Sequence, residues 1–142
     1  MKRQALLAFG IAPLLAILGA SMALAQISRD LVATVPFSFH VAGILMPAGE
    51  YVIGPAGSIQ NVIWLENAAG RTLALAGSVP VQSRALNAKD TFIFNRYGNK
   101  HFLAGITYAT GERWYVLLKS KLEKELIAGG PSAAKELVAA NR

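Results

Sequence analysis

Apolar and polar residues alternate along residues 31–41, where every odd position is apolar and the even positions include Thr34, Pro36, Ser38 and His40. A period of two predicts a half-buried β-strand. Because Pro36 has no N–H to donate to a neighbouring strand, we expect a sheet edge or a bulge at this point. Pro47 to Gly49 fit a type I turn, and a short strand is expected at residues 50–53.

Residues 59–66 and 71–79 also have the composition of strands, and residues 67–70 are a turn-forming link between them. If this link closes a hairpin, Trp64 lies opposite Leu73, with Glu66 opposite Arg71 and Val62 opposite Leu75. The break at residues 54–58 is rich in glycine but lacks the GK[ST] ending of a phosphate loop, so we interpret it as a plain loop. Residues 80–90 are polar without a clear period and predict a surface loop.

A second hairpin is predicted at residues 91–97 and 100–108, because Gly98 and Asn99 separate two aromatic and β-branched runs. This spacing favours a two-residue primed turn. The register then places Phe94 opposite Leu103 and Arg96 opposite His101, with Phe92 over Gly105. Residues 114–118 predict a further strand.

The C-terminal residues change to a helical pattern. Ser120 and Glu123 match a capping box, and Leu118, Leu122 and Leu126 share one helical face while charged residues, Glu123 among them, occupy the others. Gly129 and Gly130 are expected to end this helix, and residues 131–140 are compatible with a second short one.

Together these segments predict a mainly β fold: an antiparallel β-sandwich or a small β-barrel of about seven strands with one or two short C-terminal helices. The chain has no cysteine, so burial alone must hold the domain together. We expect an antiparallel β domain at residues 26–118, and a helical segment at 119–142 that packs on it or trails from it.

The first 25 residues have the layout of a secretory signal peptide. Lys2 and Arg3 precede an uncharged apolar run, which ends in an A-x-A triplet before Gln26. We therefore expect an exported protein, periplasmic or extracellular, whose mature chain begins near Gln26 and has no stable membrane span. The alternatives are an uncleaved membrane anchor and an outer-membrane protein.

The net charge and its distribution along the chain narrow the classes of binding partner. Without Lys2 and Arg3 the chain has 12 basic and 8 acidic residues, a net charge of +4, and the basic residues form no continuous run. This pattern is not that of a nucleic-acid-binding arm. The partner is unknown from the sequence; an anionic envelope polymer, lipid head groups or a protein fit an exported domain of this charge.

Four segments resemble those of a group of small, secreted, uncharacterised bacterial proteins: VPFSFHV at residues 35–41, PAGEY at 47–51, FNRYG at 94–98 and KSKLEKEL at 119–126. The resemblance covers most of the mature chain. It implies export and a shared β-rich fold, and it transfers no activity and no functional residue.

Catalytic and metal-binding signatures are absent from the sequence. His40 and His101 are the only histidines and have no metal-ligand spacing, although Asp90 or Glu50 could complete a two-histidine site. No G-x-S-x-G motif accompanies the serines. We expect no cofactor and no metal, and a non-enzymatic role in binding or envelope support; the alternative is a small hydrolase with an unrecognised site.

Exposed aromatic rings are common at binding sites on β-domains. Tyr97, beside the hairpin turn, is the tyrosine most expected to be exposed, whereas the two tryptophans are expected in the core. The candidate ligand-facing surface therefore consists of Arg96, Tyr97, His101 and Tyr108.

Overall fold

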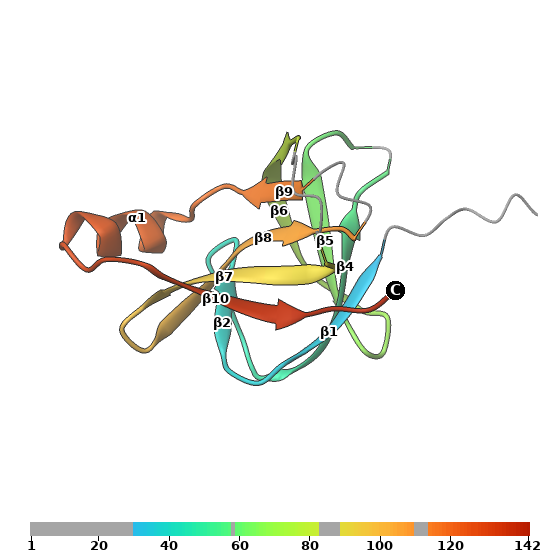
Figure 1. Ribbon diagram of the computed structural model, residues 1–142, viewed down its shortest axis with the longest axis horizontal. Coiled ribbons are helices and arrows are strands. Elements are labelled where there is room, and N and C mark those ends of the chain that lie inside the picture. Colours follow the sequence, from blue (N-terminus) through green and yellow to red (C-terminus); the bar gives the residue numbers. More distant parts are fainter. Residues whose placement is uncertain (1–29, 58, 83–88, 110–113) are drawn as a thin grey trace, which may run out of the picture.

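The computed structural model describes residues 30–57, 59–82, 89–109 and 114–142, so the predicted signal peptide lies outside the described residues. The described residues form a mainly β fold with one helix (Figure 1), which confirms the predicted class. The strands are β1 (Leu31–Val35), β2 (Phe39–Val41), β3 (Ile44–Met46), β4 (Gly49–Pro55), β5 (Val62–Asn67), β6 (Thr72–Val81), β7 (Thr91–Tyr97), β8 (Lys100–Thr107), β9 (Trp114–Leu117) and β10 (Ala134–Ala139), and the helix is α1 (Lys121–Ala128).

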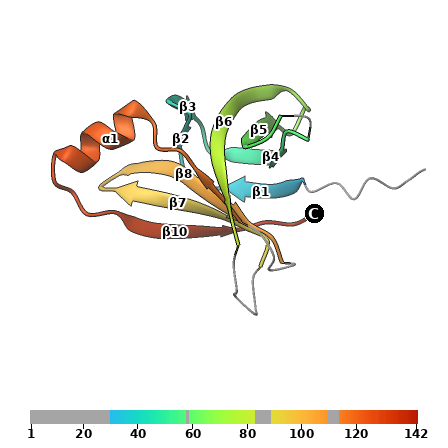
Figure 2. The same ribbon diagram turned by 90° about the horizontal axis from the view of Figure 1, so that it is seen from above.

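The strands form one open, strongly curved sheet. Hydrogen bonding connects them in the order β1, β4, β5, β6, β9, β8, β7 and β10, and the β2–β3 hairpin joins beside β8. The long strand β6 bends between the two parts of the sheet (Figure 2). The two ends of the sheet meet at a single bridge, where Val32 and Asn141 exchange backbone hydrogen bonds of 2.7 and 2.8 Å.

The alternating segment at residues 31–41 is divided at Pro36. Its odd residues are buried as predicted, except that Phe37 is only partly buried. β1 pairs with β4, however, whereas β2 pairs with β3 and β8. The residue without an N–H therefore lies where the chain passes from one part of the sheet to the other.

Aromatic rings fill the centre of the core. Phe39 contacts Phe94 and Tyr51 edge to face, with ring centroids 5.3 and 5.1 Å apart, and Phe92 and Phe94 have no exposed surface. Burying each phenylalanine contributes about 2–3 kcal/mol, which is how a domain without disulfides is stabilised.

The predicted register of the first hairpin is wrong: Trp64 pairs with Leu75, not Leu73. The turn after Asn67 contains three residues and ends in Gly70, whose φ of 74° suits a G1 bulge, and a further bulge leaves Leu73 without a partner. The three-residue turn and the bulge at Leu73 each shift the pairing of β6 with β5 by one residue. The loop predicted at residues 54–58 is also shorter than expected, because Gly54 and Pro55 belong to β4.

The predicted register of the second hairpin is confirmed for the pairs near its turn. Phe94 pairs with Leu103 and Arg96 with His101, and Gly98 has the positive φ that a primed turn requires. Farther from the turn the prediction fails, because a bulge between the two strands places Ile93 opposite Gly105 and Phe92 opposite Ile106. The predicted loop at 80–90 overlaps the end of β6, and residues 83–88 lie outside the described residues.

The prediction of a helical segment through residue 142 is wrong in its second half. Ser120 caps the N-terminus of α1, where its side chain accepts a hydrogen bond from the Glu123 N–H at 3.3 Å, and Gly129 caps the C-terminus. Residues 134–139 then form β10 antiparallel to β7. Their composition suits a helix, but the edge of β7 offers backbone partners and a place for Val138 against the core. Within the described part of the chain, no helix has the length and hydrophobicity needed to cross a membrane.

Candidate functional site

The four residues of the predicted ligand-facing surface do not lie together. Arg96 and His101 are cross-strand neighbours, as predicted. Tyr97 is only 5% exposed, so the prediction that its ring is accessible is wrong. Tyr108 is also buried, near the far end of β8, where its ring packs edge to face against Tyr115 at 6.1 Å. The two tryptophans, expected in the core, are both partly exposed.

Arg96 and His101 share a carboxylate that the sequence did not place beside them. Glu136 Oε2 lies 2.9 Å from His101 Nε2 and 3.8 Å from Arg96 Nε. The other side of the imidazole is covered by Phe37, which stacks on it with ring centroids 3.9 Å apart. Glu136 was assigned to a second helix in the sequence, so its approach to the hairpin through β10 depends on the tertiary fold.

His40 stacks on Phe102, and its Nδ1 lies 3.4 Å from the His101 carbonyl oxygen. Across residues 30–57, 59–82, 89–109 and 114–142, no group of three His, Asp or Glu side chains is placed to hold a metal ion. In the same ranges no serine hydroxyl forms a hydrogen bond with either histidine. The histidine and carboxylate are therefore paired without an assembled nucleophile.

Glu123 forms a buried polar cluster between α1 and the β7–β8 hairpin, on the face of the hairpin opposite to Arg96 and His101. Its Oε1 accepts hydrogen bonds from Asn95 Nδ2 and the Tyr97 hydroxyl, both at 3.0 Å, and Lys119 Nζ lies 3.8 Å away. Burial, together with the hydrogen bond and the charge of Glu123, raises the pKa of Tyr97 to about 12. The residue of α1 that is buried against the sheet does not belong to the leucine stripe, because Leu122 and Leu126 are only partly buried and Glu123 is the buried residue.

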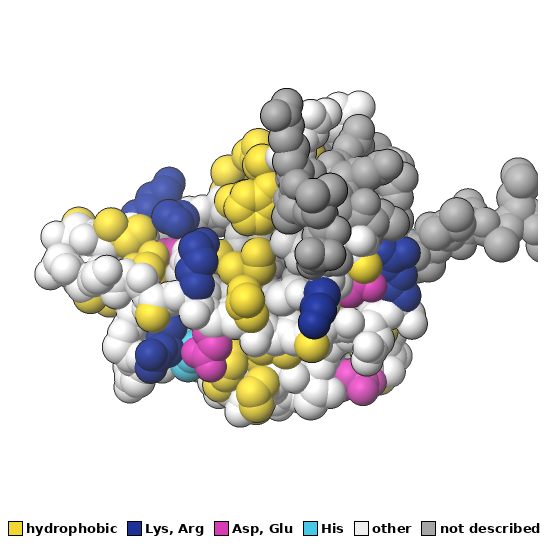
Figure 3. All heavy atoms as spheres, in the orientation of Figure 1, with side chains coloured by type: hydrophobic (Ala, Val, Ile, Leu, Met, Phe, Trp, Pro, Cys, Tyr) yellow, Lys and Arg dark blue, Asp and Glu magenta, His cyan; other side chains and the backbone are white. Residues whose placement is uncertain are grey.

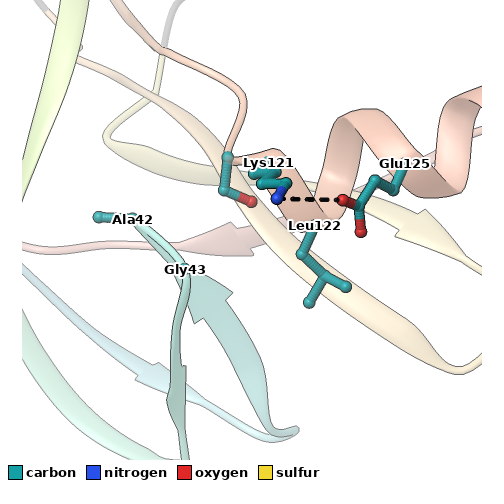
Figure 4. Close-up of a pocket in the computed structure, with 6 residues that line it drawn as sticks. Ala42, Gly43, Lys121, Leu122 and Glu125 are labelled. Atoms are coloured by element: carbon teal, nitrogen blue, oxygen red, sulfur yellow. Dashed lines mark ion pairs between the residues drawn. The ribbon is translucent and has the colours of Figure 1, made fainter.

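A shallow depression of about 490 Å³ lies between the start of α1 and the turn of the β2–β3 hairpin (Figure 4). Ala42 and Gly43 form one wall, and Leu122 lies on the other beside the 3.8 Å ion pair between Lys121 and Glu125. The depression is open to solvent and contains no buried charged group. It does not have the enclosed, convergent polar lining that is typical of a small-molecule site.

The outer side of the sheet carries a row of five aligned residues, of which Leu137 and Val79 at the two ends are exposed, whereas Ile93 is only 9% exposed and Gly105 is buried. Cross-strand pairs connect Leu137, Ile93, Gly105, Val116 and Val79 across β10, β7, β8, β9 and β6. Directly opposed residues point to the same side of a sheet, so these five share one face. The residues between them, such as Phe92, Ile106 and Tyr115, point to the other side and belong to the core.

Two further leucines extend this row. Leu118 lies over Gly77, where a Cβ would approach its Cδ1 to 2.9 Å, and Leu75 is two residues farther along β6. We call the row together with Leu118 and Leu75 the outer apolar face. Its three leucines are 57–66% exposed. Figure 3 shows hydrophobic side chains gathered over β9 and over β7 and β10, with Lys and Arg side chains on either side.

Two features hide this face in the sequence. Leu118 ends the predicted strand at residues 114–118 but also falls on the apolar stripe of the helix, and Leu137 lies in the segment compatible with a second helix. The available signal was the alternation at residues 75–79 of β6, where Leu75 and Val79 are exposed and Ala76 and Ser78 are buried.

Comparisons with protein-family models, with curated proteins and with solved structures gave no match to this chain.

Proposed function

We propose that this protein is an exported, non-enzymatic binding protein whose contact surface is the outer apolar face. The observation that carries the proposal is the exposure of Leu75, Leu118 and Leu137 on one side of a sheet whose core is filled from the other side. Single exposed leucines are ordinary on protein surfaces, whereas several on one face of a sheet are typical of an interaction site.

Covering a leucine completely is worth about 1.5–3 kcal/mol, and these leucines retain more than half of their exposed surface. A partner that covers all three therefore gains about 3–5 kcal/mol from them alone. This surface stays in contact with water in the folded protein, so burying it against a partner would stabilise the complex.

Dye binding tests the surface. We expect the folded protein to enhance the fluorescence of anilinonaphthalene sulfonate, which binds accessible apolar surface. The double variant Leu118→Gln, Leu137→Gln should lose most of this signal while keeping the wild-type thermal midpoint. Leu45→Gln is the matched control, because Leu45 on β3 is 61% exposed but lies outside the outer apolar face. Equal losses in the control and the double variant would contradict the proposal.

Export has a separate test. Cell fractionation with intact-mass measurement should recover a species outside the cytoplasm that begins at Gln26. Recovery only from membranes at full-length mass would instead support the uncleaved anchor.

A hydrolase is the second candidate, and the contact between His101 and Glu136 is the observation that favours it. A carboxylate can orient a histidine for general base catalysis. We rank this candidate second because no hydroxyl among the described residues is hydrogen-bonded to that imidazole. Hydrolysis of a chromogenic ester that is abolished by both His101→Ala and Glu136→Gln would promote it to first place.

A further inference from the structure

We propose that the partner of the outer apolar face is the surface of an anionic lipid bilayer. This inference rests on the proposed binding function and adds the chemistry of the partner. It combines two features, which are the leucines exposed on the outer apolar face and the lysines that have no acidic partner among the described residues, of which Lys135 lies on that face.

Charge is unevenly distributed over the described residues. Residues 89–142 include eight described basic residues: Lys89, Arg96, Lys100, Lys119, Lys121, Lys124, Lys135 and Arg142. The four described acidic residues of this range are each in contact with one of these bases, through the pairs Asp90–Arg142, Glu123–Lys119, Glu125–Lys121 and Glu136–Arg96. The region from β1 to β6, by contrast, has Arg71 as its one described base beside Glu50 and Glu66.

Lysines lie next to the exposed leucines in the sequence. Lys135 precedes Leu137 by two residues on β10, so its side chain leaves the same face of the sheet. Lys119 follows Leu118, and Lys124 is exposed on α1. In the part of the chain that the structure describes, Lys124 and Lys135 form no ion pair. An apolar surface flanked by unpaired cations is complementary to lipid, whose phosphates attract the lysines while the interface accepts the leucines.

Other occupants fit less well. A second copy would bring Lys135 and Lys124 of one protomer toward the same cations of the other, which costs electrostatic energy. A soluble anionic polymer would satisfy the lysines but would leave the leucines in water. A small ligand would need an enclosed cavity, and the depression beside α1 is open and lies outside the outer apolar face.

Vesicle co-sedimentation tests the inference. The probes are vesicles of phosphatidylglycerol mixed with phosphatidylcholine, and vesicles of phosphatidylcholine alone. We expect the protein to bind the anionic vesicles at least tenfold more tightly, and added salt to weaken this binding. Leu118→Gln with Leu137→Gln should reduce binding about tenfold or more, and Lys135→Gln should reduce it about fivefold, since each lysine near an anionic surface contributes about 1 kcal/mol. Leu45→Gln should bind like the wild type.

Three outcomes would overturn the inference: no binding to anionic vesicles, equal binding to both kinds of vesicle, or binding that the double leucine variant leaves unchanged. Sedimentation velocity and dye binding on the same variants separate the two proposals. Suppose that the wild type does not bind vesicles, but the double variant abolishes dye binding or a concentration-dependent dimer. The lipid partner is then wrong, and the outer apolar face remains the binding surface. If dye binding is unchanged too, both proposals fail.

Discussion

Glu123 connects α1 to the sheet through a buried carboxylate, and its replacement should be among the most destabilising single changes on this helix. The residue is 3% exposed, and its Oε1 holds both Asn95 Nδ2 and the Tyr97 hydroxyl at 3.0 Å. Glu123→Ala leaves these two donors buried without an acceptor. A hydrogen bond to a charged group is worth about 1.5–3 kcal/mol, so we expect the free energy of unfolding to fall by about 3–5 kcal/mol.

Urea unfolding followed by tryptophan fluorescence and by circular dichroism measures this loss. The matched control is Glu125→Ala, two residues along the same helix, because Glu125 is exposed and contacts only Lys121, at 3.8 Å. An exposed ion pair of this kind contributes less than about 0.5 kcal/mol. Glu123→Gln keeps one acceptor and should give an intermediate loss. If Glu123→Ala costs no more than Glu125→Ala, the buried cluster does not hold α1 on the sheet.

The same cluster predicts a loss of stability in alkali. The pKa of Tyr97 is raised to about 12 in the folded protein, whereas the unfolded chain releases this proton near the ordinary tyrosine pKa of about 10. Below pH 10 both states keep the proton, so the contribution is fully present; as pH rises from about 10 to 12, the unfolded state ionises first and stability falls. Tyr97→Phe should flatten this fall in urea titrations at increasing pH. Tyr51, whose pKa is also raised by burial, should leave a residual slope. An unchanged pH profile in Tyr97→Phe would refute the assignment.

Three further substitutions test the backbone and the core, each by urea unfolding. Gly105→Ala should cost about 2 kcal/mol because its Cβ would lie 2.6 Å from the Tyr115 carbonyl oxygen, whereas Gly57→Ala, with open space around its Cβ, should cost little. Ala42→Asn should stabilise the protein by about 1 kcal/mol, since Ala42 has a φ of 49° in a two-residue turn that favours asparagine followed by glycine; a loss of stability would count against this turn type. Ser78→Ala should be neutral or stabilising by about 1 kcal/mol, because the buried Ser78 hydroxyl has no hydrogen-bond partner among the described residues; a loss of stability would reveal a partner.

The candidate site was only partly accessible to sequence reasoning. The pairing of Arg96 with His101 follows from the short turn at Gly98, because a two-residue turn fixes the pairs nearest to it. The burial of Tyr97 does not follow from that turn, since it depends on α1 folding back over the hairpin. The role of Glu123 was hidden for the same reason: within the helix it belongs to the charged faces, and only the position of the sheet makes it an inward-facing residue.

The elements that depend only on neighbouring residues could be predicted from the sequence. Alternation at residues 31–41 defined which side chains are buried, Pro36 marked the break between β1 and β2, and Ser120 and Gly129 bounded α1. The remaining features depend on the three-dimensional fold. Bulges at Leu73 and at Ala104 moved the strand registers, because a single unpaired residue shifts every later pair. The open edge of β7 turned residues 134–139 into a strand by supplying backbone hydrogen-bond partners, and in doing so it placed Glu136 against His101 and Leu137 on the outer apolar face.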